Sequence, residues 1–177
     1  SNSYPPYQDK LIMAARKGAP SHTLVANPGG WQSVDYMVDH QPHTDRNVVY
    51  AAHYYMPSQF THQGADWTLG ADAWLGTVWE GTPEEVQLME DHMDVVKNWG
   101  KVNGIPVWVG EFGAYCAADI ESRVRWTSAA VAAIEKAGFG WCYWEFKSAG
   151  FGIWEEESGT WNPLATALLG EPPQAVK

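Results

Sequence analysis

Apolar and polar residues alternate along the chain in two patterns, one typical of helices and one typical of buried strands. The sequence predicts helices over residues 7–17, 31–40, 82–102, 119–137 and 163–169. Short apolar runs bounded by Gly, Pro or Asn predict strands over residues 22–26, 47–55, 105–113 and 140–146. Local signals support the third helix, where Thr82 is followed by two acidic residues. Helices and strands therefore alternate from end to end.

This alternation predicts an α/β fold with four parallel strands joined by right-handed crossovers. The strands are almost continuously apolar, which indicates that both faces of the sheet are covered. A closed barrel needs eight strands and about 250 residues, so a chain of 177 residues fits an open sheet or half of a barrel. No Gly-x-Gly-x-x-Gly motif follows the first strand, so a dinucleotide-binding sheet lacks support.

Polar and aromatic residues stand where three of the strands end, which is where functional residues of parallel α/β folds gather. His53 and Tyr55 end the second strand, Glu111 ends the third, and Trp144 lies near the end of the fourth. The long polar loop over residues 56–81 follows the second strand, and loops of this length in compact domains are usually functional. We therefore expect a functional site at these strand ends.

Glu111 is the strongest catalytic candidate among these residues. Strand alternation aligns its side chain with those of Val107 and Val109. Gly110 and Gly113 flank it and allow other backbone or ligand atoms to approach closely. A structural glutamate at a strand end would need a basic neighbour, and this segment has none.

Composition limits the partners of such a site. The formal charge of -10 argues against nucleic acids and anionic membranes, which select clustered Lys and Arg, and it favours a neutral substrate. No apolar run approaches the roughly 20 residues of a membrane span, and the start of the chain shows no signal peptide. Eleven Trp residues are unusual; their flat rings fit either a hydrophobic core or a surface that stacks on sugars.

Cysteine and histidine residues do not indicate a metal or a cofactor. Cys116 and Cys142 are too few for a disulfide framework and are spaced wrongly for a zinc site, so we expect two buried thiols. His40 and His43 are close in sequence, but Pro42 breaks any helix between them and no ligand partner stands at a suitable spacing.

Several ordered motifs resemble glycoside hydrolase family 5. The string VWVGEFG, with HYYMPSQFTHQGADW upstream and WCYWEF downstream, is similar to the cellulases of that family. The resemblance covers residues 7–169 and corresponds to units five to eight of the family's (β/α)8 barrel. It implies that residues 1–177 are the C-terminal half of a TIM barrel, without a metal or other cofactor.

The resemblance also implies roles for individual residues. Glu111 matches the nucleophile of a retaining endo-β-1,4-glucanase, and His53 and Tyr55 match the His-x-Tyr pair beside it. Trp144 matches the Trp under the sugar at the cleavage point. Three further Trp residues are candidates for extending the sugar platform, with packing as the equal alternative: Trp31, Trp67 and Trp154.

The chain departs from the family pattern in one large respect. The acid/base Glu of an Asn-Glu-Pro motif, an active-site Arg and a His all belong to strands that precede residue 1. We therefore expect a glucanase fragment that is inactive or very weak alone. The alternatives are a glucan-binding module without catalysis and a purely structural half-barrel, and a preference for mannan or xylan also stays open.

The partners implied are a β-glucan and a second half-barrel. The second half is expected to be another copy of the chain, giving a homodimer, or a complementary N-terminal half. Bare strand edges at residues 22–26 and 140–146 would seek such a partner. Family resemblance implies secretion or a periplasmic location.

Overall fold

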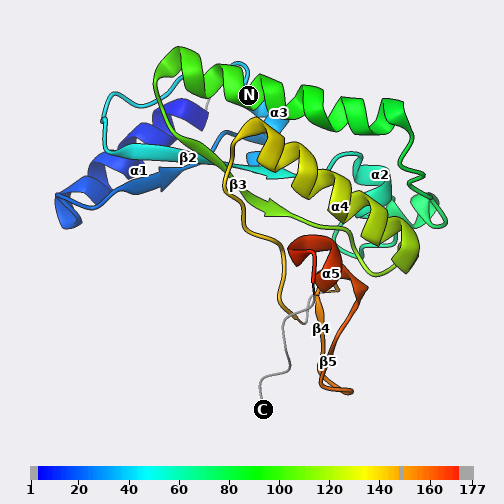
Figure 1. The fold of residues 1–177 in the computed structure, drawn as a ribbon. Coiled ribbons are helices and arrows are strands. Elements are labelled where there is room, and N and C mark those ends of the chain that lie inside the picture. The colour runs from blue at the N-terminus through cyan, green and yellow to red at the C-terminus, as the bar shows by residue number, and fades with distance from the viewer. Residues whose placement is uncertain (1–3, 148–149, 172–177) are drawn as a thin grey trace.

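The computed structural model describes residues 4–147 and 150–171. At its centre lies a parallel three-stranded sheet in the order β1–β2–β3, with β1 at Leu24–Ala26, β2 at Val48–Tyr54 and β3 at Val107–Phe112 (Figure 1). The predicted parallel α/β arrangement is confirmed. The barrel is not closed, because β1 pairs with β2 alone.

Helices cover one side of this sheet in chain order. They are α1 at Tyr4–Gly18, α3 at Pro83–Asn103, α4 at Ile120–Ala137 and α5 at Pro163–Leu169. The helix α3 packs against α4, and α4 packs against α5 (Figure 1). Among the described residues, no helix is long and apolar enough to cross a membrane.

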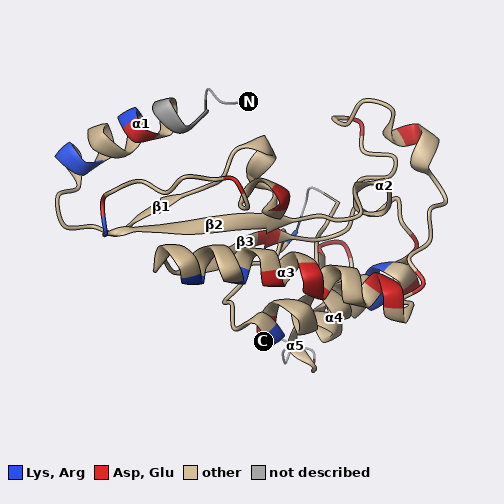
Figure 2. Cartoon of the chain, turned by 90° about the horizontal axis from the view of Figure 1, so that it is seen from above, with Lys and Arg blue, Asp and Glu red and all other residues tan. Residues whose placement is uncertain are grey.

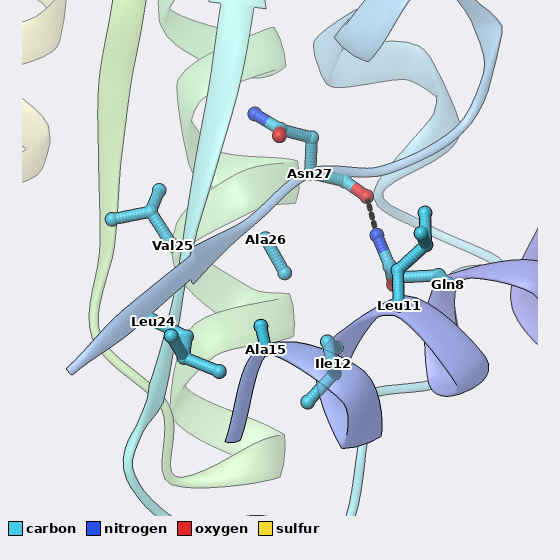
Figure 3. A pocket seen from close by; sticks show the side chains of 8 residues that line it. All are labelled: Gln8, Leu11, Ile12, Ala15, Leu24, Val25, Ala26 and Asn27. Atoms are coloured by element: carbon cyan, nitrogen blue, oxygen red, sulfur yellow. Dashed lines mark hydrogen bonds between the residues drawn. The ribbon is translucent and has the colours of Figure 1, made fainter. Parts of the chain in front are cut away.

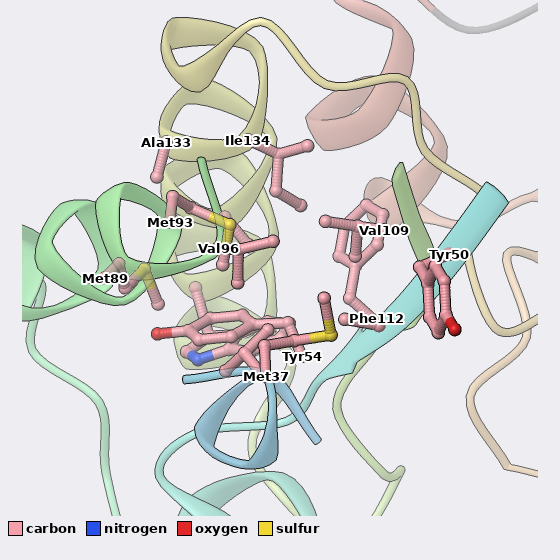
Figure 4. Close-up of a cluster of buried hydrophobic side chains, with 14 of the residues drawn as sticks. Met37, Tyr50, Tyr54, Met89, Met93, Val96, Val109, Phe112, Ala133 and Ile134 are labelled. Carbon is pink, nitrogen blue, oxygen red and sulfur yellow. The ribbon is translucent and has the colours of Figure 1, made fainter. Parts of the chain in front are cut away.

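The core lies between the sheet and the helices α3 and α4 (Figure 4). Trp126 of α4 is fully buried, stacks on Tyr54 with ring centroids 6.0 Å apart, and donates its indole N–H to Met56 O at 3.0 Å. Val109 and Phe112 of β3 are buried in the same cluster. The helix side of β3 is therefore part of the core.

A register shift separates Glu111 from this core. The strands pair Ala52 with Val109 but His53 with Glu111, so β3 has one extra residue, Gly110, at this point. Val109 packs into the core, whereas Glu111 contacts His53 on the opposite face of the sheet. Our expectation that Glu111 aligns with Val109 was wrong, because a β-bulge interrupts the alternation of side chains.

Residues 31–40 do not form the predicted short helix. Two 3₁₀ turns stand there instead, at Gly30–Gln32 and Val34–Tyr36. Trp31 has φ 59° and Gln32 has φ 66°, and Ser33 is extended and forms a parallel bridge with His53. Because the extended Ser33 pairs with the sheet, an α-helix cannot run through residues 31–40.

Residues 140–146 do not form the predicted fourth strand, although they lie along β3. A single bridge joins Trp141 to Val109, and the backbone N–H of Trp144 donates to Phe112 O at 3.0 Å. Among the described residues, residues 140–146 form a strand bridge only with β3, so they do not complete a ladder of strand hydrogen bonds. Cys142, in this segment, and Cys116, in the turn after β3, are free and exposed, which corrects the expectation of buried thiols.

Two further elements escaped the sequence analysis. A two-stranded antiparallel hairpin, β4 at Trp154–Glu155 and β5 at Thr160–Trp161, precedes α5. The loop over residues 56–81 contains a short helix α2 at Ser58–Thr61 and a 3₁₀ turn at Ala71–Trp74. Buried Gln63 holds this loop together with side-chain hydrogen bonds to the backbone at residues 60, 76 and 77.

The capping box of α3 permits a first prediction. Thr82 Oγ1 accepts from Glu85 N at 3.2 Å, and Thr82 N donates to Glu85 Oε2 at 2.8 Å. We expect Thr82→Ala to lower the free energy of unfolding by about 1 kcal/mol, because the first-turn N–H loses its partner. Urea unfolding measures this, with Ser128→Ala on the exposed face of α4 as the control, expected within about 0.5 kcal/mol of the parent. Equal losses in both variants would contradict the capping role.

Candidate active site

The carboxyl ends of β2 and β3 bring three polar side chains together. The strand register places His53 directly beside Glu111, and Tyr55 follows the last residue of β2. Tyr55 Oη donates to Glu111 Oε2 at 3.0 Å, and His53 Nδ1 lies 3.2 Å from the same oxygen. The structure therefore unites the three residues that the sequence analysis singled out at these strands.

Burial sets the protonation of the two partners of Glu111. Burial and the neighbouring Glu111 carboxylate raise the pKa of Tyr55, so its hydroxyl keeps its proton and donates it. Burial lowers the pKa of His53, and Glu111 opposes that shift. A neutral His53 ring with its proton on Nδ1 is the form that donates to a carboxylate.

The two contacts leave Glu111 with two unequal oxygens. Tyr55 and His53 both contact Oε2 of the carboxylate. Oε1 has no hydrogen-bond partner among the residues that the structure describes. The side chain is about one-third exposed, at 31%. The arrangement orients the carboxylate through one oxygen and leaves the other accessible to a ligand.

Two glycines make room around Glu111. A side chain at Gly110 would place its Cβ 3.2 Å from that of Ala51 and 3.6 Å from the ring of His53. A Cβ at Gly113 would overlap the carbonyl oxygen of Trp144. Both glycines therefore allow the close approach that the sequence suggested.

Trp144 lies at the end of residues 140–146, beside the end of β3. Its N–H bonds Phe112 O, which places its backbone next to Glu111 in the neighbouring strand. The peptide bond from Trp144 to Glu145 is cis, and the indole is 42% exposed. A partly exposed indole at this position has the surface needed for stacking on a ligand.

The other candidate Trp residues occupy different surroundings. Trp67 contacts Tyr115 at 5.0 Å and Phe151 at 6.3 Å between ring centroids, and Phe151 in turn contacts Tyr55. Trp67 thus belongs to an aromatic group that reaches the site.

Among the described residues, Trp31 and Trp154 make no ring contact with that group. Trp31 is 96% exposed in the turn after β1, two residues before the Ser33 bridge to His53. Trp154 stacks on Phe146 at 6.3 Å and packs edge-on against Trp161 at 5.0 Å, within the hairpin. The structure places Trp31 near the strand ends and Trp154 in a separate aromatic cluster.

The sequence analysis missed His62 and the residues that hold it. The His62 ring packs edge-on against Tyr55 at 5.0 Å and against Phe151 at 6.0 Å. Tyr143, whose pKa burial raises to about 12, donates its hydroxyl to Phe151 O at 2.9 Å. The motif HYYMPSQFTHQGADW contained His62, but a loop has no periodicity that would show where the ring points.

Burial of three histidine rings, complete for His40 and partial for His53 and His62, makes stability depend on pH. Burial lowers the pKa of His40, His53 and His62, although Asp9 opposes the shift at His40 and Glu111 opposes it at His53. The unfolded chain therefore binds protons at a higher pH than the folded chain does. We expect the free energy of unfolding to fall as the pH drops below about 6.5 and to change little with these groups above it.

Urea unfolding between about pH 5 and 8 tests this expectation. His40→Phe should flatten the profile, since His40 packs against Tyr50 at 5.1 Å and a Phe ring preserves that contact. Exposed His22 is the control, and His22→Ala should leave the profile unchanged. The carboxyl pKa values of Asp45 and Asp119 are lowered in the folded chain. These two groups therefore change the free energy of unfolding only below about pH 4, outside the tested range. Stability that rises on acidification from pH 7 to 5 would contradict the assignment.

The distribution of metal-binding and charged side chains limits which ligands the site could bind. Among residues 4–147 and 150–171, no group of three or more His, Cys, Asp or Glu side chains could hold a metal ion. Figure 2 shows basic residues distributed over α1, α3 and α4. The site is thus a carboxylate with two hydrogen-bond donors and aromatic neighbours.

Comparisons with known proteins show which family the chain resembles. The profile of the family described as Cellulase (glycosyl hydrolase family 5) matches residues 1–150. Endoglucanase H of Acetivibrio thermocellus is 30% identical over 153 residues, covering 86% of this chain and 15% of that protein. Endoglucanase C of the same organism is 25% identical and covers 90% of this chain and 53% of that protein.

Solved structures show the same partial coverage. Endoglucanase Cel5A of the hyperthermophile Thermotoga maritima is 36% identical, with a TM-score of 0.85 over 96% of this chain and 56% of that one. Complexes of Cel5A with cellobiose and with mannotriose are similar at 35% identity. The chain spans at most about half the length of these relatives.

Proposed function

Because the chain belongs to the cellulase family of glycosyl hydrolases, family 5, we propose that it is part of a retaining endo-β-1,4-glucanase with Glu111 as its nucleophile. One observation carries the proposal. Tyr55 and His53 both contact Oε2 of Glu111, so Oε1 is free to act as the attacking atom. This is what an attacking carboxylate needs, because hydrogen bonds keep it ionised and oriented without occupying the reacting atom.

The proposed reaction has two steps. Oε1 of Glu111 attacks the anomeric carbon, the glycosidic C–O bond breaks, and the departing oxygen takes a proton from an acid about 5 Å away. Water then attacks the same carbon, gives its proton to that group as a base, and releases Glu111. Trp144 would lie under the sugar being cleaved, and Trp31, Trp67 and Trp154 would extend the binding surface.

The acid of the first step is proposed to come from a second half-barrel. In this proposal residues 1–177 are units five to eight, and the other half contributes four strands and the acid/base carboxylate. The free edge of β1 supports a docking partner. A hollow of about 230 Å³ lies between α1 and β1, lined largely by apolar side chains, and Val25 beside it is 53% exposed (Figure 3).

The opposite face of the sheet also favours a partner. Trp108 pairs in register with Ala51, and its buried Nε1 has no hydrogen-bond partner among the described residues. Packing of a second half onto this face would supply an acceptor.

A complementary N-terminal half fits better than a second copy. Each copy has a formal charge of -10, so a homodimer would bring together two chains of strongly negative net charge. Sedimentation at micromolar concentration separates the cases for the chain alone, since a homodimer would sediment with twice the monomer mass.

Paired binding and hydrolysis assays test the proposal. A soluble neutral cellulose derivative, a mannan and a xylan are each offered to the chain. We expect glucan binding with very slow hydrolysis. Binding with no Glu111-dependent chemistry would support the module that only binds glucan, and absence of both would support the structural half-barrel.

A further inference from the structure

The hydroxyl of Thr61 sits between two groups that compete for its single proton. Thr61 is fully buried at the end of α2. Its Oγ1 lies 2.6 Å from Tyr55 O and 2.9 Å from Nδ1 of His62; a longer contact of 3.5 Å reaches Pro57 O, which, like Tyr55 O, can only accept. The backbone of Thr61 is fixed as well, because its carbonyl accepts from Tyr115 N at 2.9 Å.

Only one distribution of protons satisfies both contacts. A carbonyl oxygen has no proton to give, so the short contact with Tyr55 O requires that Thr61 donate there. The hydroxyl has then no proton left for His62, and its oxygen acts as an acceptor. His62 must therefore donate from Nδ1, since two unprotonated acceptors at 2.9 Å would repel each other.

The other ring nitrogen of His62 is available to a ligand. Nε2 has no hydrogen-bond partner among the described residues, and it is not among their buried unpartnered atoms, so solvent reaches it. Burial lowers the pKa of the ring, and no charged group contributes to that shift. A neutral imidazole with its proton on Nδ1 presents a lone pair at Nε2.

The location of His62 identifies the chemistry of that ligand. The ring packs at 5.0 Å against Tyr55, whose hydroxyl holds Glu111. We propose that Thr61 fixes His62 as the neutral Nδ1–H tautomer, so that Nε2 accepts a hydrogen bond from a hydroxyl group of the bound glucan. The ligand part of this inference rests on the proposed function. Thr61 is a positioning residue, and His62 is a substrate-binding one.

Nitrogen NMR of the free chain tests the tautomer directly. In a long-range ¹H–¹⁵N spectrum of histidine-labelled chain at about pH 7.5, above the ordinary histidine pKa, we expect the proton of His62 on Nδ1. Thr61→Val should shift the proton toward Nε2, and Thr61→Ser should restore the parental tautomer because it retains the hydroxyl. Exposed His22 should give the same signals throughout. A parental His62 protonated at Nε2, or an unchanged tautomer in folded Thr61→Val, would overturn the inference.

Titration with cellotetraose tests the ligand. We expect the Nε2 resonance of His62 to move while Nδ1 stays protonated. We also expect His62→Phe, which retains the ring contacts, to weaken binding about three- to tenfold. Binding without movement of the Nε2 resonance overturns the acceptor role. Absence of any binding overturns the glucan site and the ligand assigned to Nε2, whereas the tautomer is decided by the free chain.

Discussion

Replacement of Glu111 by Gln is expected to abolish covalent labelling of the chain by a dinitrophenyl 2-deoxy-2-fluoro-β-cellobioside. Dinitrophenolate departs without protonation, so this reagent needs a nucleophile but no acid. The fluorine slows hydrolysis of the glycosyl-enzyme, and the adduct accumulates as a defined increase in mass. The reagent therefore tests the nucleophile in the chain as it stands.

The expected size of the effect follows from the chemistry of the side chain. Gln has nearly the shape of Glu and still accepts from Tyr55, but its amide has no negative charge and is a poor nucleophile. We expect the labelling rate to fall by on the order of 10³-fold or more. In a completed barrel the same change should remove nearly all turnover.

A matched carboxylate provides the control. Glu121→Gln changes an exposed acid in the first turn of α4 and should label at the parental rate. Peptide mapping should place the adduct on Glu111. An adduct elsewhere, or a Glu111→Gln variant that retains about a tenth of the parental rate, would refute the nucleophile assignment.

The elements predicted correctly are those whose signals are local. The cap at Thr82 starts α3 as predicted, and α4 ends at Ala137, the last residue of the predicted helix. Hydrophobic spacing is equally local, because it depends on residues within a few turns. Such signals need no knowledge of distant contacts.

The elements predicted wrongly depend on tertiary pairing or are very short. Ser33 interrupts the turns after β1 because it pairs with His53, which lies 20 residues further along the chain. Residues 140–146 have a strand-like pattern but pair only with β3. Each strand of the β4–β5 hairpin has two residues, too few to show any periodicity.

The sequence identified most residues of the site but not how they are arranged. Strand ends and motifs identified His53, Tyr55 and Glu111, and the structure brings them together. The bulge at Gly110 was invisible, because an extra residue in one strand is defined only by its partner strand. His62 escaped because its place depends on how the 56–81 loop folds back.

Addition of a complementary half-barrel is expected to raise the turnover of cellotetraose by about 10²- to 10⁴-fold, the usual contribution of a positioned general acid. The complementary half would be the first four strand–helix units of a similar family 5 endoglucanase, including its acid/base carboxylate. The unprotonated oxygen of a sugar is a poor leaving group, so the chain alone should cleave cellotetraose very slowly.

Leaving-group dependence separates this effect from simple stabilisation. With dinitrophenyl cellobioside the first step needs no acid, so release of dinitrophenolate in a single turnover should increase far less than cleavage of cellotetraose. A general increase in folded protein would instead raise both rates by the same factor. The ratio of the two gains is therefore the quantity to measure.

Two variants complete the test. The added half with its acid/base Glu replaced by Gln should bind the chain without restoring cellotetraose cleavage, and Glu111→Gln in the chain should also prevent restoration. If the chain alone cleaves cellotetraose robustly, and Glu111→Gln abolishes that activity, then a carboxylate within residues 1–177 acts as the acid. The second half-barrel would in that case contribute structure and binding, and the division of the two catalytic roles between the halves would be wrong.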